Sequence, residues 1–100
     1  MHDDFIFSAA AEKEIEESFD WYEERSPGLG ARFINTIDSS LNSIARSPEA
    51  FSKKKANNRE FVVKKFPYII VYRFLKKENA IYVLHVFHTS RNPKIKYKRK

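Results

Sequence analysis

Basic side chains interleaved with aromatic residues are the groups in this sequence with the clearest capacity for chemistry. They are concentrated in the second half of the chain, and the candidates are Arg59, Lys64, Lys65, Arg73, Arg91 and Lys94, followed by Tyr97. A guanidinium can hold a phosphate or a carboxylate through two parallel hydrogen bonds, and a tyrosine ring can stack on a base. The set therefore suits RNA and an acidic polypeptide equally well. Residues 98–100 are expected to be only a solvated charge run.

Two histidines on one predicted strand are candidates for proton transfer. His85 and His88 are three residues apart, and because side chains alternate along a strand, this separation places them on opposite faces of a sheet. We expect one of them to face the core and to be structural. The other could titrate near neutrality, as an unperturbed imidazole does, and so move a proton. The more common alternative is a rim histidine that only contacts water.

No metal, cofactor or hydrolytic pair of carboxylates is expected. The histidines and acidic residues lack the ligand spacing of a zinc site, the chain has no cysteine, and its two glycines form no phosphate-binding loop. No serine stands in a nucleophile-elbow context. The acidic residues of the first predicted helix form two stripes typical of a solvated surface, Glu12, Glu16 and Glu23 and then Glu17, Asp20 and Glu24.

Charge is divided unevenly between the two halves of the chain. Residues 1–50 carry 11 acidic and 4 basic side chains, whereas residues 51–100 carry 2 acidic and 15 basic ones. A field of one sign over half of a small domain attracts partners of opposite charge.

The sequence favours a cytoplasmic protein without membrane contact. It has no cysteine, no secretory signal and no apolar run near the ~20 residues of a membrane span. We expect one domain over residues 1–100, with 92–100 as a basic tail.

A short strand and two amphipathic helices are predicted in the first half. Residues 4–8 are an apolar run typical of an edge strand, and Ser8 is placed to cap the first helix. Apolar residues then recur at helical spacing, as Ala11, Ile15, Phe19 and Tyr22 and as Leu29, Phe33, Ile37, Leu41 and Ile44. Ser26 as N-cap and Pro27 as first helical residue are expected to begin the second helix, which runs to about Arg46. The short connection predicts an antiparallel hairpin.

Three strands are predicted in the second half, over residues 59–66, 68–75 and 80–88, and residues 76–79 join the last two at hairpin length. Residues 68–72 are apolar on both faces, which is typical of a central strand. The predicted fold is α+β, with an N-terminal strand and an antiparallel helical hairpin packed on a largely antiparallel sheet that the three C-terminal strands complete. The basic residues are expected on the sheet face away from the helices.

A string of motifs runs in order through nearly the whole chain. It comprises Ala11, Ile15, Trp21-Tyr22-Glu23, Arg25-Ser26-Pro27-Gly28-Leu29-Gly30, Phe33, Pro48, Arg59, Phe66-Pro67-Tyr68, Ile70, Tyr72, Val83-Leu84, Val86, His88 and Arg91-Asn92-Pro93. No single piece is diagnostic, but together they resemble the RelE/ParE family of toxins from bacterial type II toxin-antitoxin modules. The resemblance implies a small sheet packed on a helical hairpin.

The resemblance also implies a function and a partner. A toxin of this family arrests growth, serves plasmid stabilization, and is neutralised by an antitoxin that wraps around it with an acidic or amphipathic segment. Such a partner fits the basic second half of the chain. The family divides into ribosome-dependent mRNA endonucleases of the RelE type and inhibitors of DNA gyrase of the ParE type.

The RelE-like alternative requires a catalytic site. Attack of a 2′-hydroxyl on the adjacent phosphate needs a base, an acid and cations that stabilise the developing charge. Arg91 and Tyr97 resemble the arginine and tyrosine pair of RelE-like sites, His88 could transfer the proton, and Lys64 or Lys65 could supply the cations. However, Phe66-Pro67-Tyr68 stands at the strand junction where such nucleases commonly carry another arginine.

The ParE-like alternative is favoured. The hairpin segment from Trp21 to Phe33 and the Phe66-Pro67-Tyr68 junction look closer to ParE-like members, which act by binding and require no catalytic group. A third alternative, a sheet-based RNA-binding module without toxicity, would share the basic patch but gives no reason for the hairpin string.

Overall fold

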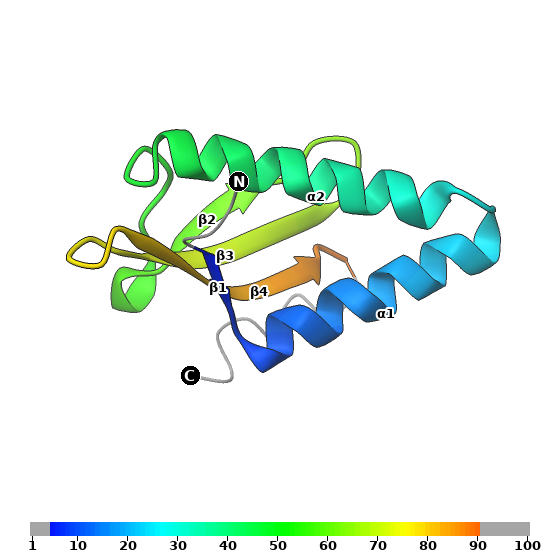
Figure 1. The fold of residues 1–100 in the computed structure, drawn as a ribbon, viewed down its shortest axis with the longest axis horizontal. Coiled ribbons are helices and arrows are strands. Elements are labelled where there is room, and N and C mark those ends of the chain that lie inside the picture. Colours follow the sequence, from blue (N-terminus) through cyan, green and yellow to red (C-terminus); the bar gives the residue numbers. More distant parts are fainter. Residues whose placement is uncertain (1–4, 91–100) are drawn as a thin grey trace.

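The chain folds in the order strand, helix, helix and three strands. The computed structural model describes residues 5–90, and Figure 1 shows its elements. These are β1 (Phe5–Phe7), α1 (Ala9–Arg25), α2 (Leu29–Arg46), the short 3-10 helix η1 (Lys55–Asn57), β2 (Arg59–Val62), β3 (Tyr68–Leu75) and β4 (Ala80–His88). The predicted α+β order is confirmed.

The strands form one mixed sheet in the order β1-β4-β3-β2. β3 pairs antiparallel with both β2 and β4, whereas β1 pairs parallel with β4. β3 is therefore an interior strand, as its apolar sequence predicts. The two edges of the sheet are short, with β1 at one and β2 at the other, and short edge strands limit unwanted pairing with other chains.

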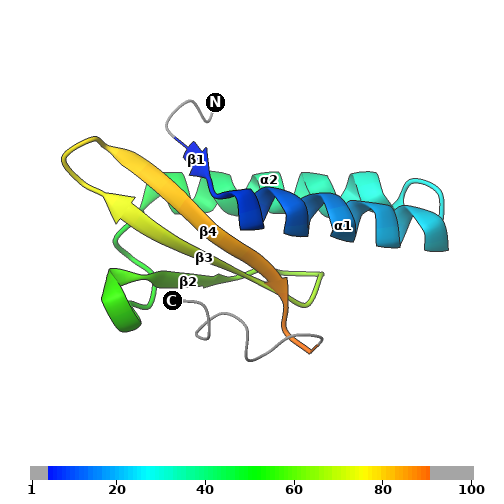
Figure 2. The same cartoon turned by 90° about the horizontal axis from the view of Figure 1, so that it is seen from below.

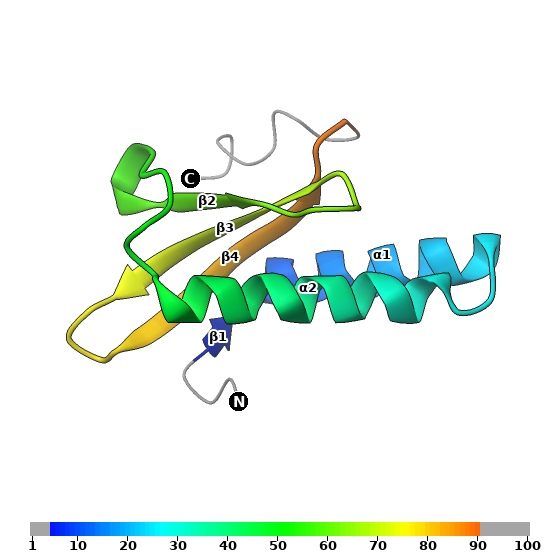
Figure 3. The ribbon, with the colours of Figure 1, turned by 90° about the horizontal axis from the view of Figure 1, so that it is seen from above.

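Both helices lie on the same face of the sheet, and the core fills the space between them and β3 and β4 (Figures 2 and 3). The predicted stripe of α2 is confirmed, because Phe33, Ile37, Leu41 and Ile44 are all buried. The sheet contributes Tyr68, Ile70, Tyr72, Val83 and Val86. Each fully buried large apolar side chain stabilises the fold by about 1.5–3 kcal/mol, so this layer holds the hairpin in place.

Ser8 joins the start of α1 to the sheet. Its hydroxyl oxygen accepts the Ala11 N–H at 2.9 Å, which confirms the predicted N-cap, and its hydroxyl donates to the Leu84 carbonyl at 2.7 Å. The Ser8 N–H also donates to the Val83 carbonyl. One residue therefore begins the helix and fixes its position against β4.

The turn between the helices differs from the predicted one. α2 begins at Leu29 with Gly28 as its N-cap, in the left-handed region at φ 91°. Ser26 ends α1 instead, and its carbonyl accepts the Leu29 N–H at 2.9 Å. The prediction of Ser26 and Pro27 as the helix start was wrong because a more distant side chain serves as the cap.

That side chain is Glu23. Its carboxylate accepts the Gly28 N–H at 2.8 Å and the Gly30 N–H at 2.9 Å, so it satisfies two amides at the start of α2 and places negative charge at that end of the helix. The spacing had predicted a purely solvated stripe that includes Glu23, and for Glu23 this prediction was wrong. A Cβ at Gly30 would lie 2.8 Å from the Phe19 carbonyl oxygen, so only glycine permits this close approach.

β2 is shorter than the predicted strand over residues 59–66. It ends at Val62, although the Val63 N–H still donates to the Tyr68 carbonyl at 3.0 Å. The chain then turns, with Lys65 in the left-handed region at φ 75°. The turn over residues 76–79 between β3 and β4 is confirmed.

Candidate functional site

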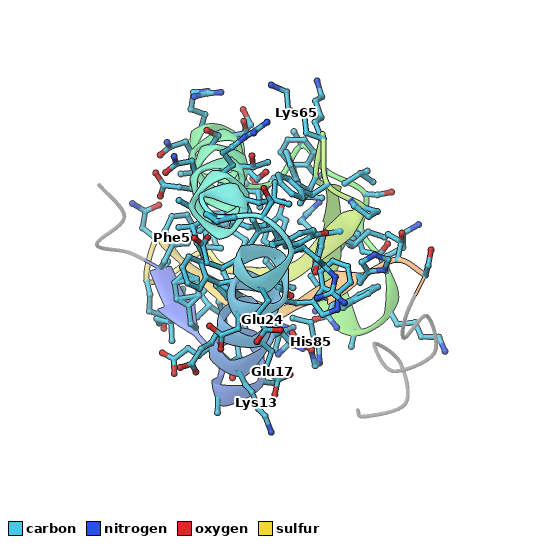
Figure 4. All side chains as sticks on the ribbon, turned by 90° about the vertical axis from the view of Figure 1, so that its right-hand side faces the viewer. Phe5, Lys13, Glu17, Glu24, Lys65 and His85 are labelled. Carbon is cyan, nitrogen blue, oxygen red and sulfur yellow. The ribbon has the colours of Figure 1, made fainter. Side chains whose placement is uncertain are left out.

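Lys64 and Lys65 occupy the turn between β2 and β3. Both side chains are exposed, and Figure 4 shows Lys65 at the top of the view, whereas His85 lies lower, beside α1. An exposed ammonium on a short turn can meet a carboxylate or phosphate without losing a contact inside the fold. Among the predicted cations that the structure describes, these two are the ones most available to a partner.

Arg59 is engaged within the fold. Its Nη1 donates to the Glu49 carbonyl at 3.1 Å and to the Phe51 carbonyl at 2.9 Å, which holds the segment after α2 against the start of β2. The neighbouring Tyr72 hydroxyl donates to the Pro48 carbonyl at 2.7 Å. Burial raises the pKa of Tyr72 to about 12, and the positive charge of Arg59 opposes this rise. A binding role for Arg59 stays a prediction beside this structural one.

Arg73 is also held by a neighbour. Its Nε and Nη2 both donate to the Asn58 side-chain oxygen, at 3.1 and 2.9 Å. Arg59 pairs with Tyr72 in the sheet, so Arg73, the next residue of β3, projects from the opposite face. The expectation of a single basic sheet face is therefore wrong for the described cations, since two lie on opposite faces and two lie in a turn.

The two histidines lie on opposite faces, as predicted. The pairing of β3 with β4 shifts at Val71/Tyr72, and beyond this irregularity His85 pairs with Val71 and His88 with Tyr68. Both side chains are half-buried. The His88 ring packs edge-on against Tyr68 at a centroid distance of 5.3 Å, and its Nδ1 accepts the Ser90 N–H at 3.0 Å.

His85 belongs to a contact between α1 and β4. Its Nδ1 lies 3.0 Å from Glu14 Oε2, while Glu14 Oε1 accepts the Val86 N–H at 2.7 Å. This arrangement attaches the helix to the strand.

The remaining predicted site residues, Arg91, Lys94 and Tyr97, lie outside the described residues 5–90. Their roles stay predictions. Of the candidate catalytic residues Arg91, Tyr97 and His88, only His88 lies within residues 5–90.

The Phe66-Pro67-Tyr68 junction is part of the aromatic core. Phe66 packs against Tyr22 and Phe33 at centroid distances of 5.0 and 5.4 Å, and Tyr68 packs against Phe33 at 4.8 Å. The Tyr68 hydroxyl donates to the Ser18 hydroxyl at 2.9 Å in a buried position. The junction thus links the helical hairpin to the sheet.

A groove lies between α2 and the edge strand β2. Its volume is about 920 Å³, and it is open to solvent. One wall is a row of hydroxyl and amide side chains on α2, which includes Asn35, Thr36, Ser39 and Ser43. The other side includes Phe51 and Phe61, whose rings meet at a centroid distance of 4.9 Å, with Val62, Lys64 and Lys65 on the strand and turn. The sequence reasoning missed this groove.

Two other features were also missed, for different reasons. The capping role of Glu23 had a local signal, since a carboxylate lies five and seven residues before two glycines. The contact of Glu14 with His85 and Val86 had none, because more than 70 residues separate the partners. Within the groove, Val62 had a weak signal, because it is a valine close to two lysines at the end of a short strand.

Within residues 5–90, no group of three or more potential ligands is arranged to hold a metal ion. In the same range, no helix has the length and apolar character required to cross a bilayer.

Solved structures of toxin-antitoxin systems share this fold. A chain of the chromosomal ParDE system from P. aeruginosa is 12% identical with a TM-score of 0.69, over 84% of this chain and 92% of that chain. A chain of the intact E. coli RelBE complex is 18% identical with a TM-score of 0.64, over 87% and 96%. A double mutant of the E. coli toxin RelE, in complex with an antitoxin RelBc peptide, is 19% identical with a TM-score of 0.62, over 100% and 99%.

These likenesses establish the fold. Among curated proteins, none matches this chain in sequence at a significant level. The family-level comparison is more specific, because the model for the ParE toxin of the parDE type II toxin-antitoxin system matches residues 5–93, and the chain therefore belongs to the ParE toxin family.

Proposed function

We propose that this protein arrests bacterial growth by binding DNA gyrase in the cytoplasm, and that a cognate antitoxin neutralises it. Membership of the ParE toxin family is the observation that carries the proposal. Action by binding requires a complementary surface and no group that transfers a proton.

The chemistry around the strand junction supports binding over cleavage. RNA cleavage would need cations at the reacting phosphate, but Phe66 and Tyr68 fill the junction with aromatic rings. Arg59 and Arg73 donate to groups inside the fold, so their charges are already engaged.

An antitoxin partner is supported by the structures that share the fold, which are described as toxin-antitoxin systems or complexes. The excess of basic side chains over residues 51–100 suits an acidic segment. Desolvated charge pairs between two such surfaces contribute specificity and fast association.

The test compares two purified activities. Relaxed plasmid with gyrase and ATP is incubated with and without the protein, and a defined transcript is translated in a bacterial extract with the same additions. We expect loss of supercoiling and an intact transcript. Transcript cleavage that disappears in Arg91→Ala or Tyr97→Phe would contradict action on gyrase and support the RelE-like alternative.

That alternative retains one specific observation in its favour, since the two E. coli RelE-containing structures share the fold over most of the chain. Growth of a bacterial culture after induction of the protein alone separates both toxins from the RNA-binding module. Unimpaired growth with folded protein would favour the module.

A further inference from the structure

Two lysine-rich loops lie at the same end of the molecule. The first follows α2 and contains η1, and the second is the turn between β3 and β4. Figure 1 shows both loops at the end of the molecule away from the turn between the helices, and Figures 2 and 3 agree. Residues 52–59 and 73–79 together carry seven basic side chains and one acidic one. We call these two segments the basic end.

The lysines of the basic end face solvent. Lys53, Lys54, Lys76 and Lys77 are all exposed, and the Lys76 side chain stays 77% exposed although it lies 3.9 Å from Glu49. In the part of the chain that the structure describes, Lys53, Lys54 and Lys77 take part in no salt bridge. The positive field of this end is therefore available to a partner of opposite charge.

The backbone of the first loop is held to the sheet at both of its ends. At one end, Lys53 forms an antiparallel bridge with Arg59. At the other end, the Asn58 side-chain oxygen accepts two N–H groups of Arg73, at 3.1 and 2.9 Å, and the Asn58 N–H donates to the Lys55 carbonyl at 3.0 Å. A loop fixed in this way loses less conformational entropy when a partner binds to it.

The basic end has no large exposed apolar side chain. Within residues 5–90, the exposed large apolar residues are Ile6, Trp21 and Val62, and all three lie outside the basic end. Apolar and aromatic anchors carry most of the affinity at protein–protein interfaces. A surface of cations without such an anchor suits the phosphate backbone of a nucleic acid instead, because there the charges supply the affinity.

The width of the basic end suits a duplex. The segment with Lys53 lies outside β2, and the second loop ends at β4, so three strand spacings separate the two loops. At about 4.8 Å for each spacing, this distance is about 14 Å. Duplex DNA carries one phosphate charge for about 1.7 Å of its axis. Cations on both loops can therefore reach phosphates of one duplex at the same time.

We propose that the basic end binds the phosphate backbone of duplex DNA, with Lys53 and Lys54 on one side and Lys77 on the other. The inference rests on the proposed function in one respect, since gyrase acts on duplex DNA and so selects DNA as the nucleic acid. Binding of this kind does not depend on base sequence and weakens steeply with salt. Contact with DNA that gyrase already holds adds a second attachment, and two linked attachments bind more tightly than either one alone.

The test measures the fluorescence anisotropy of a labelled DNA duplex of about two helical turns as the full chain is added at several salt concentrations. We expect the logarithm of the association constant to fall with the logarithm of the salt concentration with a slope of about −3, which corresponds to about three phosphate contacts. A duplex of scrambled sequence should bind equally well. Absence of binding at low salt, or a slope near zero, would overturn the proposal.

Two competitors test the other partners that a basic surface can have. An unlabelled RNA duplex of the same length should displace the labelled DNA no better than unlabelled DNA does, and a glutamate peptide of equal charge should displace it less well. More effective displacement by the RNA would assign the surface to RNA, and more effective displacement by the peptide would assign it to an acidic protein. Either result would overturn the proposal.

Matched charge reversals locate the contact. The double variant Lys53→Glu and Lys54→Glu should weaken binding about tenfold or more at low salt and reduce the salt slope by about two. The control, Lys13→Glu and Arg32→Glu, reverses two exposed cations on the helices and should weaken binding less than about threefold. Should the first variant fail to fold, Lys53→Gln and Lys54→Gln should reduce the slope by a similar amount. Equal loss of binding in test and control variants would overturn the proposal.

The anisotropy measurements contain no gyrase, so they can fail independently of the supercoiling test. DNA binding with the expected slope, together with unaffected supercoiling, would support the basic end and contradict the proposed function. Inhibited supercoiling without binding to the duplex would contradict the basic end and support action on gyrase.

Discussion

Glu14 on α1 and His85 on β4 lie in direct contact, with 3.0 Å between Oε2 and Nδ1. The same carboxylate accepts the Val86 N–H at 2.7 Å. β1 pairs with β4 only as far as Val83, so Glu14 provides the acceptor that a longer β1 would have supplied. A helix side chain thus completes the edge of the sheet.

Glu14→Ala should lower the free energy of unfolding by about 1.5–3 kcal/mol, because it leaves the buried Val86 N–H without its charged acceptor. Glu14→Gln retains a carbonyl oxygen and should lose less than half as much. Urea unfolding measures both. Glu16→Ala, an exposed position on the same helix, is the control, and a Glu14→Ala variant as stable as this control would contradict the role.

Gly30→Ala should destabilise the protein by about 1–3 kcal/mol, although alanine normally favours helices over glycine by about 1 kcal/mol. The added Cβ would lie 2.8 Å from the Phe19 carbonyl oxygen, which is backbone and cannot rotate away. Ser39→Ala at an exposed position of α2 should have little effect. A stabilised Gly30→Ala variant in thermal unfolding would show that the hairpin has room at this contact.

Tyr72 should make stability fall at high pH. Its folded pKa of about 12 exceeds the ordinary value of 10.0, so the unfolded chain releases the phenolic proton first. The contribution of the protonated Tyr72 hydroxyl to the free energy of unfolding is about 2–3 kcal/mol. It is fully present below pH 10 and is lost as pH rises through 12. Urea unfolding at several pH values checks this. Tyr72→Phe should remove this part of the slope, and an identical slope in the variant would contradict the assignment.

Arg59→Ala should lower the free energy of unfolding far more than Lys64→Ala, because Arg59 holds a loop inside the fold and Lys64 lies on the surface. Arg59→Ala leaves the Glu49 and Phe51 carbonyls without a charged donor and should cost about 1.5–3 kcal/mol. Lys64→Ala, at an exposed turn position, should change the free energy of unfolding by less than about 0.5 kcal/mol. Equal effects in urea unfolding would mean that Arg59 does not hold the loop.

Elements with a local periodic signal were predictable. The stripe of α2, the cap at Ser8 and the central position of β3 each depend on residues close in sequence, and the structure confirms them. The start of α2 was wrong because Glu23 reaches across the turn to Gly28 and Gly30 and displaces the expected cap at Ser26.

The candidate site was predictable only as a set of residue types. Exposure of Lys64 and Lys65 agrees with a binding role, but the contacts of Arg59 and Arg73 depend on where the loop before β2 folds back. Spacing cannot show that, because the partners come from other elements. The groove beside Val62 likewise exists only once α2 and β2 are packed together.

The parallel pairing of β1 with β4 determines when the fold can be completed. Phe5 pairs with Ile81, so the first strand has no position in the sheet until nearly all of the described chain has been synthesised. The β3–β4 hairpin brings together residues close in sequence and can form early, whereas β1 must close a loop that contains every other element. The chain therefore completes its sheet only after β4 has left the ribosome.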